Sequence, residues 1–188
     1  MKPILIITFL FCYFLNCSAQ QASGDSALRS LAKLDIGFQG VGLAYEARMG
    51  KRTTLELAAG AGGGYDVSED GVGYEWNILQ PAFYAMVTPK LYYNRMKRIQ
   101  KGKRVENNTG NYLGLRLKFA SGSIASNDYL RSAALFNVHW GMQRYVGRRW
   151  ILNAHFGAGY AQDINSIFGT IYPAIDFKFS YVFTRPRS

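Results

Sequence analysis

The chain has 188 residues, of which 15% are aromatic and 18% are charged, and its formal net charge is +10 at pH 7. The length suits one domain, and no apolar run beyond the first fifteen residues approaches the 18 residues of a membrane-spanning helix. Both cysteines, Cys12 and Cys17, lie near the N-terminus. The rest of the chain therefore offers no disulfide, no thiolate metal site and no cysteine nucleophile.

Residues 1–19 have the pattern of a secretory signal peptide. One lysine precedes an apolar run from Pro3 to Leu15, and small residues follow it. At about 1.5 Å per residue this run spans only about 20 Å, which is less than a hydrocarbon core of ~30 Å. We expect export through the Sec route, cleavage after Ala19 and a single β-barrel domain over residues 20–188. Lipidation of Cys17 is the alternative, and the residue before that cysteine is larger than lipidation usually requires.

Eight segments alternate apolar and polar residues with the period of a β-strand. In chain order they are residues 27–36, 41–48, 53–65, 74–93, 112–120, 130–143, 150–160 and 171–183. The last is the clearest, because Phe177 and Phe179 share one face and Asp176 and Lys178 the other. Bacterial single-chain barrels have an even number of strands, from 8 upward. The pattern predicts an all-β fold, an eight-stranded antiparallel up-and-down transmembrane β-barrel.

The segment at 74–93 is longer than the others and contains Pro81 and Pro89. Proline removes a donor from the hydrogen-bond ladder of a sheet. We expect one or both prolines to mark a bulge or a strand end.

The polar faces of these segments distinguish a membrane barrel from a soluble one. A soluble barrel would show Lys, Glu and Thr to water there, but small residues crowd these faces: Gly42, Ala44, Ala58, Gly60, Gly62, Gly64, Gly114, Gly157 and Gly159. Glycine is tolerated in a strand mainly where backbones or bulky groups approach closely. Small residues that alternate with charges suit the interior of a narrow barrel whose apolar faces contact lipid. The alternative is a soluble periplasmic lipid-binding barrel.

The connections between segments alternate in charge. Those at 49–52, 94–109 and 144–149 are basic, whereas those at 66–73, 121–129 and 161–170 contain acidic residues and no Lys or Arg. Transmembrane barrels keep their termini and short turns in the periplasm. We therefore expect the basic connections in the periplasm and the acidic loops outside the cell.

The connection at 94–109 is longer than a short periplasmic turn and carries six cations: Arg95, Lys97, Arg98, Lys101, Lys103 and Arg104. It is either a solvated hairpin tip or an electrostatic contact with lipid head groups or an acidic periplasmic partner. Nucleic acid is not expected as a partner of an exported barrel.

Two stretches, residues 41–64 and 91–119, together with the signal that ends Ser-Ala-Gln-Gln, resemble small outer-membrane β-barrel proteins of Bacteroidota. The resemblance covers most of the mature chain. It implies an eight-stranded barrel in the cell outer membrane, in contact with outer-membrane lipids, and it implies no activity. The aromatic final strand also resembles the signal by which the barrel assembly machinery recognises its substrates.

Charged residues and two histidines collect on the predicted inward faces. The predicted lumen network consists of Arg29, Asp35, Glu46, Arg48, Glu56, Arg116, Lys118, Arg131, His139, His155, Asp176 and Lys178, and Lys33 and Lys90 share these faces. The network is either an ion-paired plug, because eight strands leave an interior that side chains just fill, or a polar channel or ligand cavity. An excess of bases there suggests water or an anion inside.

The same residues give little sign of catalysis or metal binding. A metal site at His139 and His155 would need a third ligand such as Asp176 or Glu46. Lipid A deacylase barrels carry a His-x-Ser pair, but Trp-Gly follows the first histidine here and Phe-Gly follows the second. We expect no catalytic residue, no metal and no cofactor, and a structural, envelope-stabilising or surface-interaction role. A lipid-modifying barrel enzyme is the alternative.

Overall fold

The computed structural model describes residues 27–68, 70–76, 81–122, 131–147 and 149–184. Its barrel strands are β1 Leu31–Gly37, β2 Gly40–Arg48, β3 Thr53–Gly62, β6 Ala82–Tyr92, β7 Gly110–Ala120, β8 Ala133–Gly147, β9 Trp150–Asp163 and β10 Gly169–Val182. Between β3 and β6, a hairpin contains β4 Gly64–Val67 and β5 Val72–Glu75. The predicted signal peptide, residues 1–19, lies outside the described residues.

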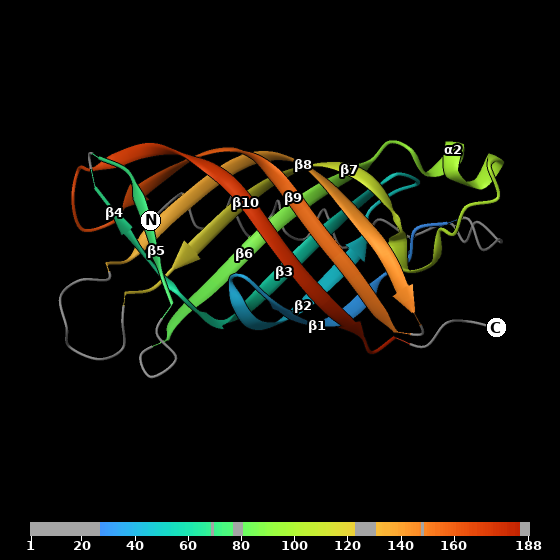
Figure 1. Ribbon diagram of the computed structural model, residues 1–188, viewed down its shortest axis with the longest axis horizontal. Coiled ribbons are helices and arrows are strands. Elements are labelled where there is room, and N and C mark those ends of the chain that lie inside the picture. The colour runs from blue at the N-terminus through green and yellow to red at the C-terminus, as the bar shows by residue number, and fades with distance from the viewer. Residues whose placement is uncertain (1–26, 69, 77–80, 123–130, 148, 185–188) are drawn as a thin grey trace, which may run out of the picture.

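The eight long strands form one closed barrel in the order β1-β10-β9-β8-β7-β6-β3-β2, and every neighbouring pair is antiparallel (Figure 1). Barrel strands that follow one another in the chain are neighbours in the wall. β3 and β6 are also neighbours, although the β4–β5 hairpin lies between them in the sequence. The predicted all-β fold and the count of eight antiparallel strands are confirmed. Within the described residues, no helix is long and apolar enough to cross a membrane.

The prediction of single strands at 53–65 and 74–93 is wrong in its details. Both segments divide, and their inner ends form the β4–β5 hairpin, which pairs Tyr65 with Tyr74. The division occurs at Gly63, where a Cβ atom would overlap the Tyr74 ring, so only glycine lets β3 continue into β4 this closely. A hairpin arm and a barrel strand have the same alternating pattern. The sequence therefore does not show where the barrel strand ends and the hairpin begins.

The two prolines of the fourth segment have different positions. Pro81 immediately precedes β6, as expected of a strand end. Pro89 lies inside β6 and is paired with Leu55 of β3, but the pairing of β6 with β7 is interrupted at residues 88 and 89 and then resumes in the same register. Pro89 therefore interrupts the ladder without causing a bulge.

The barrel is apolar outside and polar inside. On each strand, exposed residues alternate with buried ones, and every strand exposes large apolar side chains, for example Ile36, Leu43, Leu57, Val87, Leu115, Val138, Phe156 and Ile175. The alternate positions are buried and are mostly polar or small. This distribution is the reverse of that in a soluble protein, whose large apolar residues point into the core.

The small residues of the inward faces make room for lumen rings. A Cβ atom at Gly114 would overlap the His139 ring, and one at Gly42 or Gly60 would overlap the Tyr84 hydroxyl. Glycine is therefore required at these positions by the close approach of a ring. Gly64 is an exception to the prediction, because it begins β4 and lies outside the barrel wall.

Candidate functional site: the polar lumen

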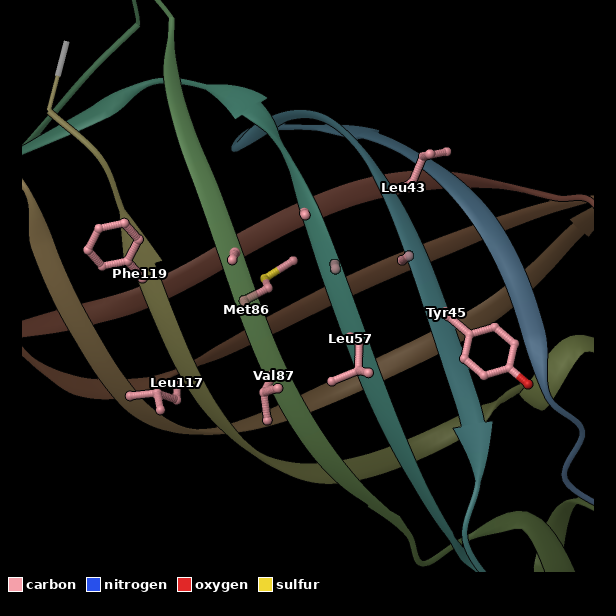
Figure 2. Close-up of a pocket in the computed structure, with 11 residues that line it drawn as sticks. Leu43, Tyr45, Leu57, Met86, Val87, Leu117 and Phe119 are labelled. Carbon is pink, nitrogen blue, oxygen red and sulfur yellow. The ribbon is translucent and has the colours of Figure 1, made fainter. Parts of the chain in front are cut away.

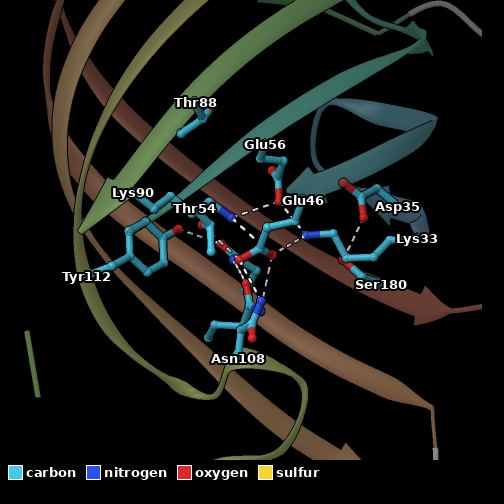
Figure 3. A network of polar contacts seen from close by, with 12 residues as sticks. Lys33, Asp35, Glu46, Thr54, Glu56, Thr88, Lys90, Asn108, Tyr112 and Ser180 are labelled. Carbon is cyan, nitrogen blue, oxygen red and sulfur yellow. Dashed lines mark hydrogen bonds and ion pairs between the residues drawn. The ribbon is translucent and has the colours of Figure 1, made fainter. Parts of the chain in front are cut away.

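Glu56 lies at the centre of a cluster of buried lysines inside the barrel (Figure 3). Its Oε2 accepts hydrogen bonds from Lys33 and, at 2.7 Å, from Lys90. Its Oε1 accepts one from Lys178 at 2.9 Å. These lysines come from β1, β6 and β10, so a single carboxylate of β3 connects three other strands across the lumen.

Two further carboxylates balance the charge of this cluster. Glu46 of β2 accepts a hydrogen bond from Lys33 at 2.9 Å. Asp35 of β1 pairs with Lys178 and accepts a hydrogen bond from Ser180 at 2.6 Å. Three lysines therefore face three carboxylates, and none of the six side chains is more than 6% exposed. Buried charges need such pairing, because an unpaired charge in a low-dielectric interior is costly.

Neutral donors satisfy the remaining oxygen of Glu46. Its Oε1 accepts hydrogen bonds from Tyr92 at 2.9 Å, from Thr54 at 3.0 Å and from Asn108 at 3.1 Å. The alternating pattern of β6 predicts that Tyr92 points into the lumen, because it follows the exposed Leu91 in the strand. The sequence contains no signal for Asn108, which belongs to a turn and reaches the lumen from the end of the barrel.

A second, separate ion pair lies farther along the lumen. Arg116 of β7 donates to Asp176 of β10 at 2.9 Å, and its Nε donates to Thr88 at 3.3 Å. The rings of His139 and His155 lie beside this pair, with their centroids 4.1 Å apart and their planes tilted by 31°, and His155 Nδ1 is 3.9 Å from Asp176 Oδ2. The two histidines thus fill the lumen next to an ion pair, as predicted from their faces.

Lys118 differs from the other lumen cations. Its Nζ donates to Gln39 Oε1 at 2.7 Å and to Tyr65 Oη at 3.0 Å, and it lies 4.8 Å from the centre of the Tyr84 ring. It is only 2% exposed. Among the described residues it has no carboxylate partner, so no carboxylate of the lumen neutralises a protonated Lys118.

Three predicted members of the lumen network lie at the ends of the barrel instead. The prediction that Arg131 points into the lumen is wrong, because its side chain is 54% exposed and pairs with Asp163 at 3.3 Å. Arg48 ends β2 and donates to the Gly50 carbonyl at 3.3 Å. Arg29 precedes β1, whose first residue is Leu31. The alternating pattern continues past the last paired residue of a strand. It therefore predicts lumen residues beyond both ends of the barrel.

The connection at 94–109 closes one end of the barrel. It contains the helix α2 Arg95–Gln100 and the short 3-10 turn η1 Glu106–Asn108. Asn108 is buried and exchanges two hydrogen bonds with the Arg29 backbone, at 2.8 Å each. Asn107 and Asn108 adopt φ angles of 49° and 58°, a left-handed conformation that asparagine tolerates better than most residues.

Arg95 fixes this connection from inside. It is buried, and its guanidinium donates to the carbonyls of Val105 at 2.9 Å and Thr109 at 3.0 Å. Burial lowers the pKa of Arg95 from its usual value, although arginine stays charged at any physiological pH. Arg98 donates to the Arg104 carbonyl at 2.9 Å. The other cations of the predicted basic turn are exposed: Lys97, Lys101, Lys103 and Arg104.

The β4–β5 hairpin closes the opposite end (Figure 1). Tyr65 and Val67 of β4 are buried against Ala120, Leu135 and Ala161 of the barrel strands. The Tyr65 hydroxyl also accepts the hydrogen bond from Lys118. Side chains thus fill the lumen between two folded closures, which agrees with the predicted plug more than with an open channel.

Within the described part of the chain, no group of three or more His, Cys, Asp or Glu is arranged to hold a metal ion. Comparison of the chain with protein-family models, with curated proteins and with solved structures found no match. The resemblance to Bacteroidota barrels therefore stays a prediction.

Replacing the central carboxylate tests the role of the cluster. We expect Glu56→Gln, which keeps the shape of the side chain, to lower the free energy of unfolding by about 3–5 kcal/mol, because three buried lysines lose their shared partner. Urea unfolding followed by tryptophan fluorescence measures the change. Glu75→Gln at an exposed position of β5 is the matched control and should leave stability unchanged. Equal stabilities of the two variants would contradict the proposed role.

Proposed function

We propose that the protein is a bacterial outer-membrane β-barrel with a structural, envelope-stabilising or surface-interaction role and no enzymatic activity. One observation carries the proposal: all eight barrel strands expose apolar side chains outward and bury polar ones inward. Soluble monomers rarely expose a contiguous apolar patch larger than a few hundred Å². An apolar surface that surrounds the barrel is suited to lipid.

Aromatic side chains gather near both ends of the outer wall, which supports the same proposal. Near the closure formed by α2, Trp140 donates to the Tyr93 hydroxyl at 2.7 Å, and Trp150 packs against Tyr181. At the other end, Phe38, Tyr160 and Phe168 are exposed. Girdles of aromatic residues at the two interfaces are typical of membrane barrels.

The outer wall also carries apolar grooves, one of which Figure 2 shows. One, of about 580 Å³, crosses β2, β3, β6 and β7 where Ala59 and Ala85 lie between larger side chains such as Leu57 and Phe119. A second, of about 740 Å³, lies along Leu55, Leu91 and Leu113. Grooves with this lining are suited to the acyl chains of surrounding lipids.

In the proposed orientation, the connection at 94–109 faces the periplasm and the β4–β5 hairpin faces the outside of the cell. The exposed cations Lys97, Lys101, Lys103 and Arg104 then point toward the inner leaflet of the outer membrane and the periplasm. Contact with anionic lipid head groups, or with an acidic periplasmic partner, is the proposed use of this surface.

Of the two alternatives, a soluble lipid-binding barrel has less support, because such a barrel needs an apolar lumen. A lipid-modifying enzyme also has little support. In the described part of the chain no serine hydroxyl contacts a histidine: Ser180 donates to Asp35, and His139 Nδ1 is paired with Asn137.

Mass profiles of lipid A and phospholipids should be the same in cells with and without the protein. A new or missing acyl chain would favour the enzyme.

Fractionation of cells that express the full chain tests the proposed location. We expect the protein in the outer-membrane fraction, and we expect the unheated and heated protein to migrate differently on a denaturing gel, as folded barrels do. Recovery in the soluble fraction would disprove the proposal.

Cysteine labelling adds a control for orientation. We expect Asp66→Cys in the hairpin to react with a membrane-impermeant maleimide on intact cells. Lys101→Cys in the periplasmic connection should react only after the outer membrane is opened. Both positions are exposed, so a difference between them reports their side of the membrane.

The two closures and the ion cluster also predict electrical behaviour. We expect the barrel, inserted into a planar bilayer, to give no conductance steps above background, since side chains occupy the lumen between Asn108 and Tyr65. A porin inserted under the same conditions serves as the positive control. Stable unitary conductance from the wild-type protein would show that the lumen is a channel.

A further inference from the structure

In the closed barrel, one strand extends beyond its neighbour on one side. β10 pairs with β9 from Gly169 to Tyr181, but it pairs with β1 only from Lys178 onward. The last bond on the β1 side runs from the Phe38 N–H to the Phe177 carbonyl, at 2.9 Å. In the described structure, residues 169–176 of β10 therefore have no strand partner on that side.

Pro173 occupies this open edge. The Phe183 N–H points to Ala32 of β1, whereas the Val182 N–H points to Arg149 beside β9. Odd-numbered residues of β10 thus direct their backbone groups to the β1 side. The N–H group that Pro173 lacks is one that would have faced the gap, and proline is tolerated at an unpaired strand edge of this kind.

A cavity of about 120 Å³ lies behind the gap. Its rim includes Phe38, Pro173 and Ile175, and both Phe38 and Ile175 are exposed on the apolar outer wall. Its inner lining includes the two cations Arg116 and Lys118. The lining of the cavity thus combines charged residues of the lumen with exposed residues of the outer wall, and the cavity has room for several waters or one small oxyanion.

The polar groups that line this cavity are suited to an anion. They are the side chains of Gln39, Tyr65, Tyr74, Arg116, Lys118, Asn137, His155 and Tyr172. The Tyr172 hydroxyl accepts from Asn137 at 2.9 Å and the Tyr65 hydroxyl accepts from Lys118, so each keeps its own hydrogen to donate. No carboxylate is part of the described lining, and Asp176 is engaged by Arg116.

We infer that the gap beside β10 admits the phosphate of a lipid head group, which binds Lys118 and Arg116 in this cavity. The inference rests on the proposed membrane location. A phosphate would give Lys118 the anionic partner that no described carboxylate provides. Charge-assisted hydrogen bonds to phosphate are strong in a partly dehydrated site. The position of the opening favours a lipid over a free ion, because acyl chains of a bound lipid would lie along Phe38 and Ile175.

Native mass spectrometry of the purified full-length protein in neutral detergent tests this binding. The added lipids are phosphatidic acid and diacylglycerol with the same acyl chains. We expect the wild-type protein to retain one phosphatidic acid and no diacylglycerol. Lys118→Met should lower the retained fraction at least tenfold, whereas Lys51→Met, at an exposed lysine of the β2–β3 turn, should not change it. Equal retention by Lys118→Met and wild type, or by both lipids, would overturn the inference.

A second variant keeps both cations and closes the entrance. Ile175→Trp enlarges an exposed rim residue and should lower retention of phosphatidic acid without preventing folding, which heat-modifiable migration verifies for every variant. Undiminished retention by a folded Ile175→Trp variant would overturn the lateral route. Binding of inorganic phosphate in preference to the lipid would overturn the choice of a lipid. A wild-type protein found in membranes that retains no lipid contradicts this inference alone, whereas a soluble protein contradicts the proposed function.

Discussion

The structure depends on the neutralisation of charge inside a closed wall. A barrel whose outer face is apolar must place its ionisable side chains inward, where water is scarce and each charge needs an opposite one within reach. Glu56 meets this condition for three lysines at once, and Glu46 and Asp35 complete the balance. The small residues on the inward faces then follow, because the charged side chains and the lumen rings need the space that larger side chains would occupy.

The same constraint explains how the two ends are closed. At one end Asn108 adds a neutral donor to Glu46, and at the other end Tyr65 adds its hydroxyl to Lys118. Each closure is therefore bonded to the charged interior. Lys118 is the place where the balance is left incomplete among the described residues, and it lies beside the only stretch of β10 that lacks a neighbour in the described wall. The unneutralised charge and the opening in the wall coincide.

Much of this architecture could be predicted from the sequence, because a strand with one polar face has an alternating pattern. That pattern alone predicts that Lys33, Glu56 and Asp176 point inward. The pattern has no information about which strands pair or where pairing stops, so it merged the β4–β5 hairpin with its neighbours and placed Arg131 in the lumen. Asn108 was beyond its reach, since the position of a turn side chain depends on how the whole connection folds.

The ion cluster joins the first barrel strand to the last. Lys178 contacts Asp35 across 143 positions of sequence and Glu56 across 122. A chain that has not yet added β10 therefore contains Asp35 and Glu56 without one of their cations. The electrostatic balance of the cluster is reached only on completion of the wall, so a truncated or stalled barrel is destabilised by one carboxylate in excess over its lysines. The cluster thereby makes the final step of assembly cooperative with all that precede it.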